Sequence, residues 1–464
     1  MLEYKIKTFL ITRWGTIVCY DSQKKTMYHS SMENGILPKE ALNFHSFGCY
    51  LLSDILDGDK YLIENDPSGK YSYLKCRDSY VTAHPDGKIN SFQNMKNPWE
   101  RFFIINEDDI KVLSFILSSS FVNKNNNSII KKEHIFLLED FSLQFGENTF
   151  QLSDNFNTSH GNFDAIYRGD EKKSSISEIT LWDDKWKPFT FTTYRPLVYF
   201  CTFGKDSTET LNISIKSLKI LGRYSGDLLI ITDISRQNIE ILCPELEGLN
   251  FYIWNIYNQY NLDFYSSRFK IFEWENIYRF SPLIYMDTDI VVDKPINDLL
   301  IEIFHETKMS AQMEAFTQRV SDSSVGGSLI KEDNRCKNSF CTEPGFNSGL
   351  ITIPKIENCI SNIRKIYKCI YRYAEDSKSR TILSHFDQSI ANYINFVDDC
   401  FDLSFLKDRV NFFYYDAIRI NDLSISEREQ KNYFGFVHFW GTSERVKYMN
   451  IYIDSVLNKT DFVV

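Results

Sequence analysis

Two aspartates separated by one residue have the types and spacing in this sequence best suited to chemistry. Asp287 and Asp289 directly follow Leu283-Ile-Tyr-Met286, an apolar run typical of a buried strand. In a near-extended chain, alternate side chains point to the same face, so the two carboxylates can share one divalent cation. Oxygen ligands suit Mg²⁺ or Mn²⁺. Such a cation can join an acidic protein to a nucleotide diphosphate and act as a Lewis acid on the departing group.

The spacing alone is a weak signal, because the same pattern recurs at Asp57-Gly58-Asp59. That second pair follows no parallel-sheet strand and lies in a polar, turn-like stretch, so we interpret it as a solvated turn. The position at the end of a predicted strand therefore distinguishes Asp287 and Asp289.

The elements that must position this pair begin at Leu197, where strand and helix patterns start to alternate. Apolar runs predict strands from Leu197, from Asp227, near Phe251 and at 283–286. Between the first two, Leu211, Ile215 and Leu218 share one helical face, and a second, longer helix is predicted from 264 to 280. This alternation predicts an α/β domain, with a mostly parallel, Rossmann-like sheet and helices on both faces. Ligands of such sheets bind beyond the carboxyl ends of the strands.

Other polar residues occur in order around this motif, and each has a purely structural alternative. Arg268 could be a solvated helix residue, and Asn347-Ser-Gly349 could be a turn before a strand. Asp387 could cap a helix, and His438 could be a core histidine in an aromatic strand.

Taken together, these motifs resemble glycosyltransferase family eight, whose members have the GT-A fold. The resemblance runs from about Leu197 to Tyr448 and is strongest at Tyr285-Met-Asp-Thr-Asp-Ile-Val-Val292. It implies that Asp287, Asp289 and His438 hold the metal, with Asp287 shared between metal and ribose. It also implies a catalytic group around the transferred sugar, made of Asp387, Gln388 and Asn347. The implied nucleotide and diphosphate contacts are Thr202, Phe203, Arg268, Asp287, Gly441 and Lys447.

One departure from the family concerns the basic residue after the late glycine. The family has a phosphate-contacting lysine close behind it, whereas Gly441 is followed here by Thr-Ser-Glu-Arg-Val-Lys447. Either Arg445 or Lys447 can fill that position.

The resemblance implies a retaining glycosyltransferase that moves a hexose from a UDP-sugar, with Mn²⁺ or Mg²⁺ as cofactor. The acceptor, whether glycan, lipid or protein, is left open. One alternative is a carbohydrate- or protein-binding protein with a vestigial transferase domain, which the loosened Lys447 spacing favours. Nucleotidyl transfer is a further alternative, because a metal-binding carboxylate pair also suits it.

The first third of the chain is predicted to be rich in β-strands. Asp86-Gly87 between alternating runs is a strong hairpin signal, and parts of residues 80–102 recur about 40 residues later. This repeat resembles a β-trefoil of the fascin-like kind, a module that often binds sugars or proteins, although a purely structural domain is an equal alternative. We therefore expect a β-rich module at 1–155, a connector at 156–195 and the transferase domain at 196–464.

Composition limits the remaining possibilities. The chain has 464 residues, a net charge of −10 and a pI of about 5.4, which argues against a nucleic-acid partner. There is no run of about 20 apolar residues that could form a transmembrane segment. The first residues lack the apolar core of a signal peptide, so we expect a cytoplasmic protein, with export by a route without a cleaved signal left open.

Overall fold

The computed structural model describes most of the chain. The described residues are 6–32, 35–47, 50–52, 60–68, 70–156, 164–168, 175–256, 262–313, 329, 345–375, 386–412, 435–440 and 443–460. The chain forms two compact units, one made of 1–167 with 176–194 and the other of 168–175 with 195–464. Asp57 and Asp59, the second Asp-x-Asp pair, lie outside the described residues, as does Gly441. Within the described ranges, no helix combines the length and the apolar character needed to cross a membrane.

The first unit begins with a ten-stranded antiparallel sheet. Its first part consists of strands β1 (Ile6–Thr12), β2 (Ile17–Asp21), β3 (Thr26–Ser30), β4 (Phe44–Phe47), β5 (Tyr50–Leu52) and β6 (Lys60–Asn65). Its second part consists of β7 (Ser72–Cys76), β8 (Ser79–Ala83), β9 (Ile89–Gln93) and β10 (Arg101–Asn106). Because β10 pairs with both β1 and β7, the sheet closes on itself. The predicted hairpin at Asp86-Gly87 is confirmed, since it joins β8 to β9.

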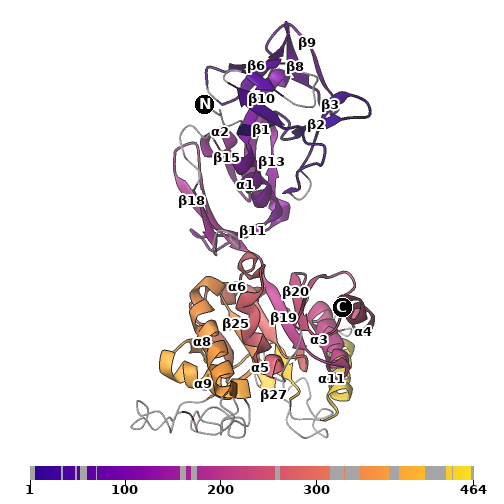
Figure 1. Ribbon diagram of the computed structural model, residues 1–464, viewed down its shortest axis with the longest axis vertical. Coiled ribbons are helices and arrows are strands. Elements are labelled where there is room, and N and C mark those ends of the chain that lie inside the picture. The colour runs from indigo at the N-terminus through magenta and orange to yellow at the C-terminus, as the bar shows by residue number, and fades with distance from the viewer. Residues whose placement is uncertain are drawn as a thin grey trace. The chain divides into compact units, whose positions relative to one another are not determined.

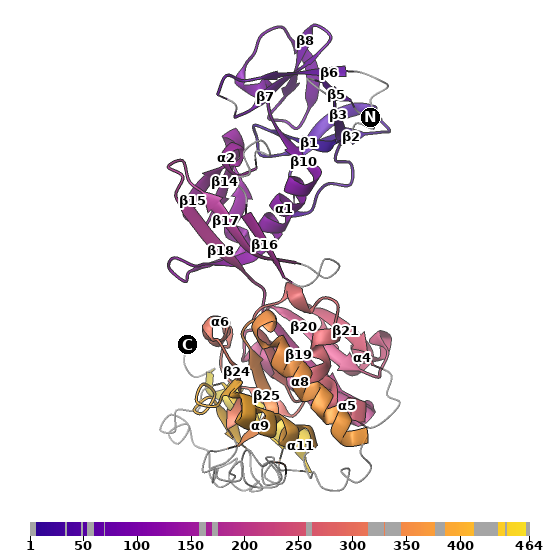
Figure 2. The same cartoon turned by 60° about the vertical axis from the view of Figure 1, so that its left-hand side comes forward.

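A helix and two further sheets complete the first unit. Helix α1 (Glu107–Ser118) is capped by Asn106, whose side chain accepts a hydrogen bond from the backbone of Asp109. One sheet contains β11 (Ser120–Asn123), β12 (Ile129–Ile130), β16 (Asp164–Arg168), β17 (Ser175–Trp182) and β18 (Pro188–Tyr194). The other contains β13 (Ile135–Leu137), β14 (Ser142–Phe145) and β15 (Asn148–Gln151), followed by the short helix α2 (Leu152–Asn155). The sheets share a core in which the Phe145 and Phe191 rings are 4.2 Å apart. Figure 2 labels β14, β15, β17 and β18 of these two sheets.

The trefoil expectation is not confirmed. Tyr80-Val81 and Phe121-Val122, the matched parts of the repeat, lie in two different sheets. The matched endings also differ in local structure, because Glu100-Arg-Phe102 passes from a 3₁₀ turn into β10, whereas Asp140 and Phe141 of the second copy have positive φ. The segment expected to be a connector also contains strands β16, β17 and β18, and β18 pairs with β11 of the first unit.

The second unit has the expected mixed α/β architecture. Its seven-stranded sheet has the order β21-β20-β19-β22-β25-β24-β26. The parallel part is β19 (Leu197–Thr202), β20 (Asp227–Thr232), β21 (Asn250–Asn255) and β22 (Leu283–Met286). Strand β25 (Phe346–Ile353) runs antiparallel to β22 and to β24 (Met309–Met313), and β26 (Phe401–Asp402) ends the sheet. A small second sheet contains β23 (Ile290–Val292), β27 (Val410–Phe412) and β28 (Phe436–His438).

Helices cover both faces of the seven-stranded sheet, as predicted (Figure 1). Helices α5 (Leu262–Lys270), α8 (Ile356–Glu375) and α9 (Phe386–Asp398) share one core with alternate residues of β19. Helix α3 (Thr208–Ile220) packs with α11 (Arg445–Thr460), and the other α-helices in the described part of this unit are α4 (Arg236–Leu242) and α6 (Asn297–His305). The predicted face of α3 is confirmed, because Leu211, Ile215 and Leu218 are fully buried.

The long helix expected at 264–280 is wrong in its length. Helix α5 ends at Lys270 and is followed by 3₁₀ turns at Ile271–Glu273 and Ile277–Arg279. The buried residues of this stretch, Ile271, Trp274, Ile277 and Phe280, are spaced by three. Trp274 and Phe280, which follow the two turns, have extended backbone, so the chain does not continue as one helix.

Candidate functional site

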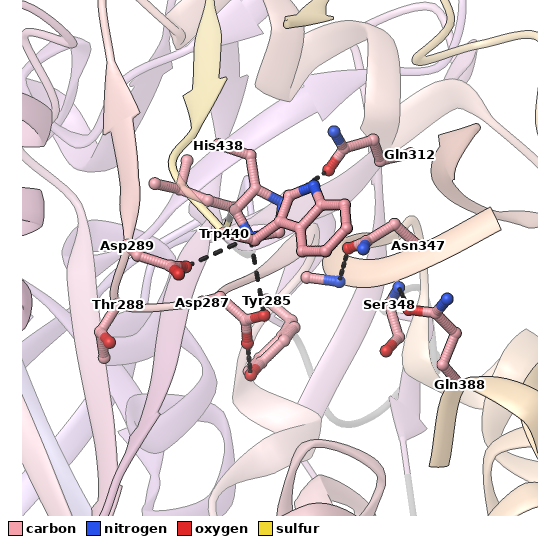
Figure 3. A network of polar contacts seen from close by, with 12 residues as sticks. Tyr285, Asp287, Thr288, Asp289, Gln312, Asn347, Ser348, Gln388, His438 and Trp440 are labelled. Atoms are coloured by element: carbon pink, nitrogen blue, oxygen red, sulfur yellow. Dashed lines mark hydrogen bonds and ion pairs between the residues drawn. The ribbon is translucent and has the colours of Figure 1, made fainter. Parts of the chain in front are cut away.

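Asp287 and Asp289 lie at the carboxyl end of β22, but in a turn and not in extended chain as expected. The backbone N–H of Ile290 donates to the carbonyl of Asp287 at 3.2 Å, which closes the turn. Thr288 is directed to α3, where the hydroxyl of Thr210 donates to it at 3.0 Å. The two carboxylates that flank Thr288 lie on the opposite side (Figure 3). The turn, and not strand alternation, therefore brings the two carboxylates together.

His438 completes a cluster with the two carboxylates. It ends β28, which pairs with β23 so that His438 is opposite Ile290. Its Nε2 is 3.2 Å from Asp289 Oδ1 and 3.9 Å from Asp287 Oδ2. One ligand atom from each of the three residues lies within 4.8 Å of the others (Figure 3). The imidazole is 1% exposed, and its contacts with the carboxylates set it apart from an ordinary core histidine.

The residues of this cluster fit a divalent cation. Two carboxylates and one imidazole nitrogen are a ligand set that Mn²⁺ and similar ions accept. Burial by itself would raise the pKa of Asp289, but His438 and Arg445 outweigh it and hold the pKa below its usual value. The carboxylate is therefore ionised at neutral pH, as a metal ligand must be.

Gly349 on β25 allows His438 and Asp287 to lie close to the backbone of this strand. Its carbonyl accepts a hydrogen bond from the backbone of Asp287 at 2.7 Å. A Cβ at this position would lie 2.4 Å from His438 Cε1 and 2.8 Å from Asp287 Oδ2. Only a residue without a side chain fits here, so Gly349 is a requirement of the cluster and not only a turn residue.

Gln312 is a site residue that the sequence analysis missed. It lies on β24, and its side-chain oxygen is 3.1 Å from His438 Nδ1 (Figure 3). When the Nδ1–H donates a hydrogen bond to Gln312, the Nε2 lone pair is available to ligate a cation shared with the carboxylates. A signal was present, because Gln312 is the one amide in Met309-Ser-Ala-Gln-Met313 and is buried. A buried amide must find a hydrogen-bond partner, which often is a functional residue.

Arg268 connects the cluster to a third carboxylate. Its Nη1 is 3.4 Å from Asp287 Oδ1, and its Nε is 3.0 Å from Asp387 Oδ2. Nη1 also donates to the carbonyl of Ser348 at 2.7 Å, and the guanidinium lies over the Tyr285 ring at 4.8 Å. The side chain is only 15% exposed, which contradicts the alternative of a solvated helix residue.

Asp387 and Gln388 lie in the first turn of α9, where both side chains are buried. Ser348 contacts both: its hydroxyl donates to Asp387 at 3.4 Å, and its backbone N–H donates to Gln388 Oε1 at 3.3 Å. Burial raises the pKa of Asp387, while Arg268 opposes the shift. Further along α9, the Asn392 amide bonds to both the N–H and the carbonyl of Phe346 at 2.8 Å, which ties the helix to β25.

The side chain of Asn347 bonds to the backbone of its own strand, β25. Its side-chain oxygen accepts the N–H of Gly349 at 2.8 Å (Figure 3). This local bond is typical of an asparagine that shapes a backbone turn. Asn347 therefore lies beside the cluster and stabilises the backbone at the start of β25.

Thr202 and Phe203 lie at the carboxyl end of β19, the parallel neighbour of β22. The Thr202 hydroxyl is 2.7 Å from that of Ser207, and the N–H of Gly204 donates to Asp233 Oδ1 at 3.0 Å. These bonds hold the loop after β19 against the end of β20. The loop thus occupies the sheet edge at which ligands of parallel sheets bind.

Arg445, rather than Lys447, contacts the cluster. Arg445 Nε is 3.2 Å from Asp289 Oδ2, while the Lys447 ammonium pairs with Glu444 at 3.2 Å. Both lie in the first turn of α11.

Comparisons with known proteins found likeness in structure only. No protein-family model and no curated protein matches the sequence. The structure of galactosyltransferase LgtC with donor and acceptor sugar analogues is 14% identical, covers 56% of this chain and 95% of that chain, and has a TM-score of 0.36. The glycosyltransferase GlyE of Streptococcus pneumoniae TIGR4 is 15% identical over 57% of this chain and 63% of that chain, with a TM-score of 0.36. The bifunctional glycosyltransferase WbbM is 13% identical over 80% of this chain and 66% of that chain, with a TM-score of 0.39. These solved structures are glycosyltransferases to which the chain is similar at low identity.

Proposed function

We propose that the second unit is a metal-dependent, retaining glycosyltransferase of the GT-A kind. It would move a hexose from a UDP-sugar to a glycan, lipid or protein acceptor. One observation carries the proposal: Asp287, Asp289 and His438 converge at the carboxyl end of β22, and Arg268 joins them to Asp387. This combination suits sugar transfer from a nucleotide, because a diphosphate leaves on one side while positive charge develops at the sugar on the other.

The metal side of the site would be held by Asp287, Asp289 and His438. A divalent cation bound there would neutralise the departing diphosphate. Arg445 has a half-exposed side chain beside Asp289 and is placed better than Lys447 to add a second positive charge. The loop at Thr202 and Phe203 would hold the nucleotide base, largely through its backbone.

The sugar side would be formed by Asp387 and Gln388 with Asn347 beside them. Arg268 and Ser348 fix the Asp387 carboxylate, so its charge stays oriented while the sugar becomes positive. Gln388 is fixed in the same way through the Ser348 N–H. Retention of configuration rests on the family resemblance alone, and Asp387 serves here as a positioning and stabilising group.

The experiment that tests this function is UDP release from a panel of UDP-sugars, with Mn²⁺ and with excess EDTA. We expect slow release from one preferred UDP-sugar, because water can replace the acceptor, and we expect EDTA to abolish it. Adding Mn²⁺ back in excess over EDTA should restore release, which controls for damage by the chelator. Absence of both UDP binding and Mn²⁺ binding would contradict the proposal.

A second candidate is supported by the Arg445 contact. A guanidinium on Asp289 can neutralise that carboxylate without a metal, as expected of a vestigial transferase site in a carbohydrate- or protein-binding protein. The two candidates differ in one result of the same assay. A vestigial site would show no metal-dependent turnover with any UDP-sugar.

Gln312 provides a prediction about metal affinity. We expect Gln312→Leu to weaken Mn²⁺ binding by about tenfold, because His438 loses the acceptor that fixes its ring and tautomer. Gln312→Glu keeps an acceptor for Nδ1–H and should bind Mn²⁺ more tightly than Gln312→Leu. Isothermal titration with Mn²⁺ measures both. Equal affinities for the two variants would show that Gln312 only fills space.

A further inference from the structure

The first unit contains a pocket that the transferase proposal does not use. It has a volume of about 450 Å³, within the range of small-molecule sites. Two turns form it: the one between β11 and β12, and the hairpin between β14 and β15. The lining combines polar and apolar surface in about equal shares, and its amides are Asn123, Asn126, Gln144 and Asn148.

The polar lining is held in a fixed geometry. Asn126 accepts from both the N–H and the hydroxyl of Ser128, at 3.0 and 2.7 Å. Across the pocket, the amide nitrogen of Gln144 donates to the carbonyl of Gly146 at 2.9 Å. Gly146 itself has φ +65, and a Cβ at this position would lie 3.4 Å from the Ile130 side chain, so the hairpin lies close to β12. Side chains fixed in this way lose little entropy when a ligand binds.

An aromatic ring is exposed among these amides. Phe136 is 42% exposed, although its neighbour Ile135 is buried, because alternation along β13 directs Phe136 outward. An exposed ring loses favourable free energy unless something apolar covers it. A sugar has an apolar C–H face that can stack on an aromatic ring. The hydroxyls at its edge can bond to amides, which offer both donors and acceptors.

The charge of the pocket selects against anionic ligands. Of the described residues that line it, Glu147 is the one acid and His134 the one residue able to carry positive charge, with no lysine or arginine. Phosphate and nucleotide sites need cations or a cluster of backbone N–H groups. A neutral ligand with many hydroxyls matches this lining better.

We propose that this pocket binds a neutral glycan, with the sugar face on Phe136 and the hydroxyls on the amides of Gln144 and Asn148. This binding would be a function of the first unit, beyond sugar transfer, and it does not depend on the site at Asp289. The glycan can be the acceptor of the transferase or an anchor to a glycan-bearing surface.

The test measures binding of neutral disaccharides to the full-length chain by saturation-transfer NMR. The probes are lactose, maltose, cellobiose, mannobiose and diacetylchitobiose at millimolar concentration. We expect at least one to bind, with an affinity that changes less than about twofold between low and high salt, because no charge is involved. No binding by any probe, or binding that salt abolishes, would overturn the proposal.

Variants locate the binding within the molecule. Phe136→Ala should weaken glycan binding by about tenfold or more, whereas Phe136→Trp should preserve it. Asn148→Asp should weaken glycan binding even with Phe136 in place. Trp99→Ala is the matched control, because Trp99 is also 42% exposed in the first unit but does not line the pocket. Asp289→Asn should leave the affinity unchanged. Binding that survives Phe136→Ala and Asn148→Asp, or that Asp289→Asn removes, would place the glycan elsewhere and refute the proposal.

Discussion

Asp289→Asn is expected to lower UDP-sugar turnover by about 10³-fold or more. Asp289 is buried, and its carboxylate contacts both His438 Nε2 and Arg445 Nε at 3.2 Å. Asparagine keeps the shape but removes the charge, so both the metal affinity and the neutralisation of the diphosphate fall. A loss of roughly 4 kcal/mol in the transition state, the size attributed to metal catalysis, corresponds to that factor.

The variant also has a readout that does not depend on turnover. Mn²⁺ that binds only the folded chain raises its unfolding temperature, by an amount that follows the affinity. We expect this rise in the wild type and not in Asp289→Asn. Asp298→Asn is the matched control, since it removes the same charge from an exposed position on α6. An equal rise in wild type and Asp289→Asn would show that the metal binds elsewhere.

The location of the candidate site could be predicted from the sequence because it follows from strand order. An apolar strand that ends in two carboxylates, within a pattern of alternating strands and helices, must present them at the ligand edge of the sheet. His438 was placed by the order of motifs along the chain, and the structure brings it to Asp289. The pairing that does so, β23 with β28, joins distant parts of the chain and has no local signal.

The side chains that support the cluster were not predictable in the same way. Gln312 and Ser348 act through contacts set by the packing of β24, β25 and α9, including a bulge beside Gln312. Gln312 lies in none of the motifs, and the motif Asn347-Ser-Gly349 does not specify the partners of its middle residue. The available signal was a polar residue within a buried strand. This signal indicates that the residue has a hydrogen-bond partner, but it does not show which residue the partner is.

The errors in the fold have physical causes. Apolar residues after Lys270 recur at a spacing close to that of a helix, so the pattern alone does not show that the helix ends there. In the first third, two acidic–polar–Phe segments at or before strands gave a repeat signal, but strand pairing, which the local sequence does not specify, placed the two copies in different sheets.

Gly349→Ala is expected to reduce turnover by about 100-fold, although it changes no charge and removes no ligand. The added methyl group would lie 2.4 Å from His438 Cε1 and 2.8 Å from Asp287 Oδ2, closer than such atoms can approach. The imidazole or the carboxylate must therefore move away, and a displacement of about 1 Å at a reacting centre costs a factor of this size. Mn²⁺ affinity, measured by isothermal titration, should fall together with turnover.

Stability must be separated from geometry in this experiment. Overpacking at Gly349 should also lower the free energy of unfolding, by about 1–3 kcal/mol. Gly248→Ala is a control for that loss, because Gly248 has φ +81 and open space around it, so alanine strains the backbone without touching the cluster. If Gly349→Ala lost stability and kept its Mn²⁺ affinity and turnover, the close approach of β25 to His438 would be a matter of packing alone. If Mn²⁺ affinity falls in Gly349→Ala and not in Gly248→Ala, the glycine is what allows Asp287, Asp289 and His438 to share one ion.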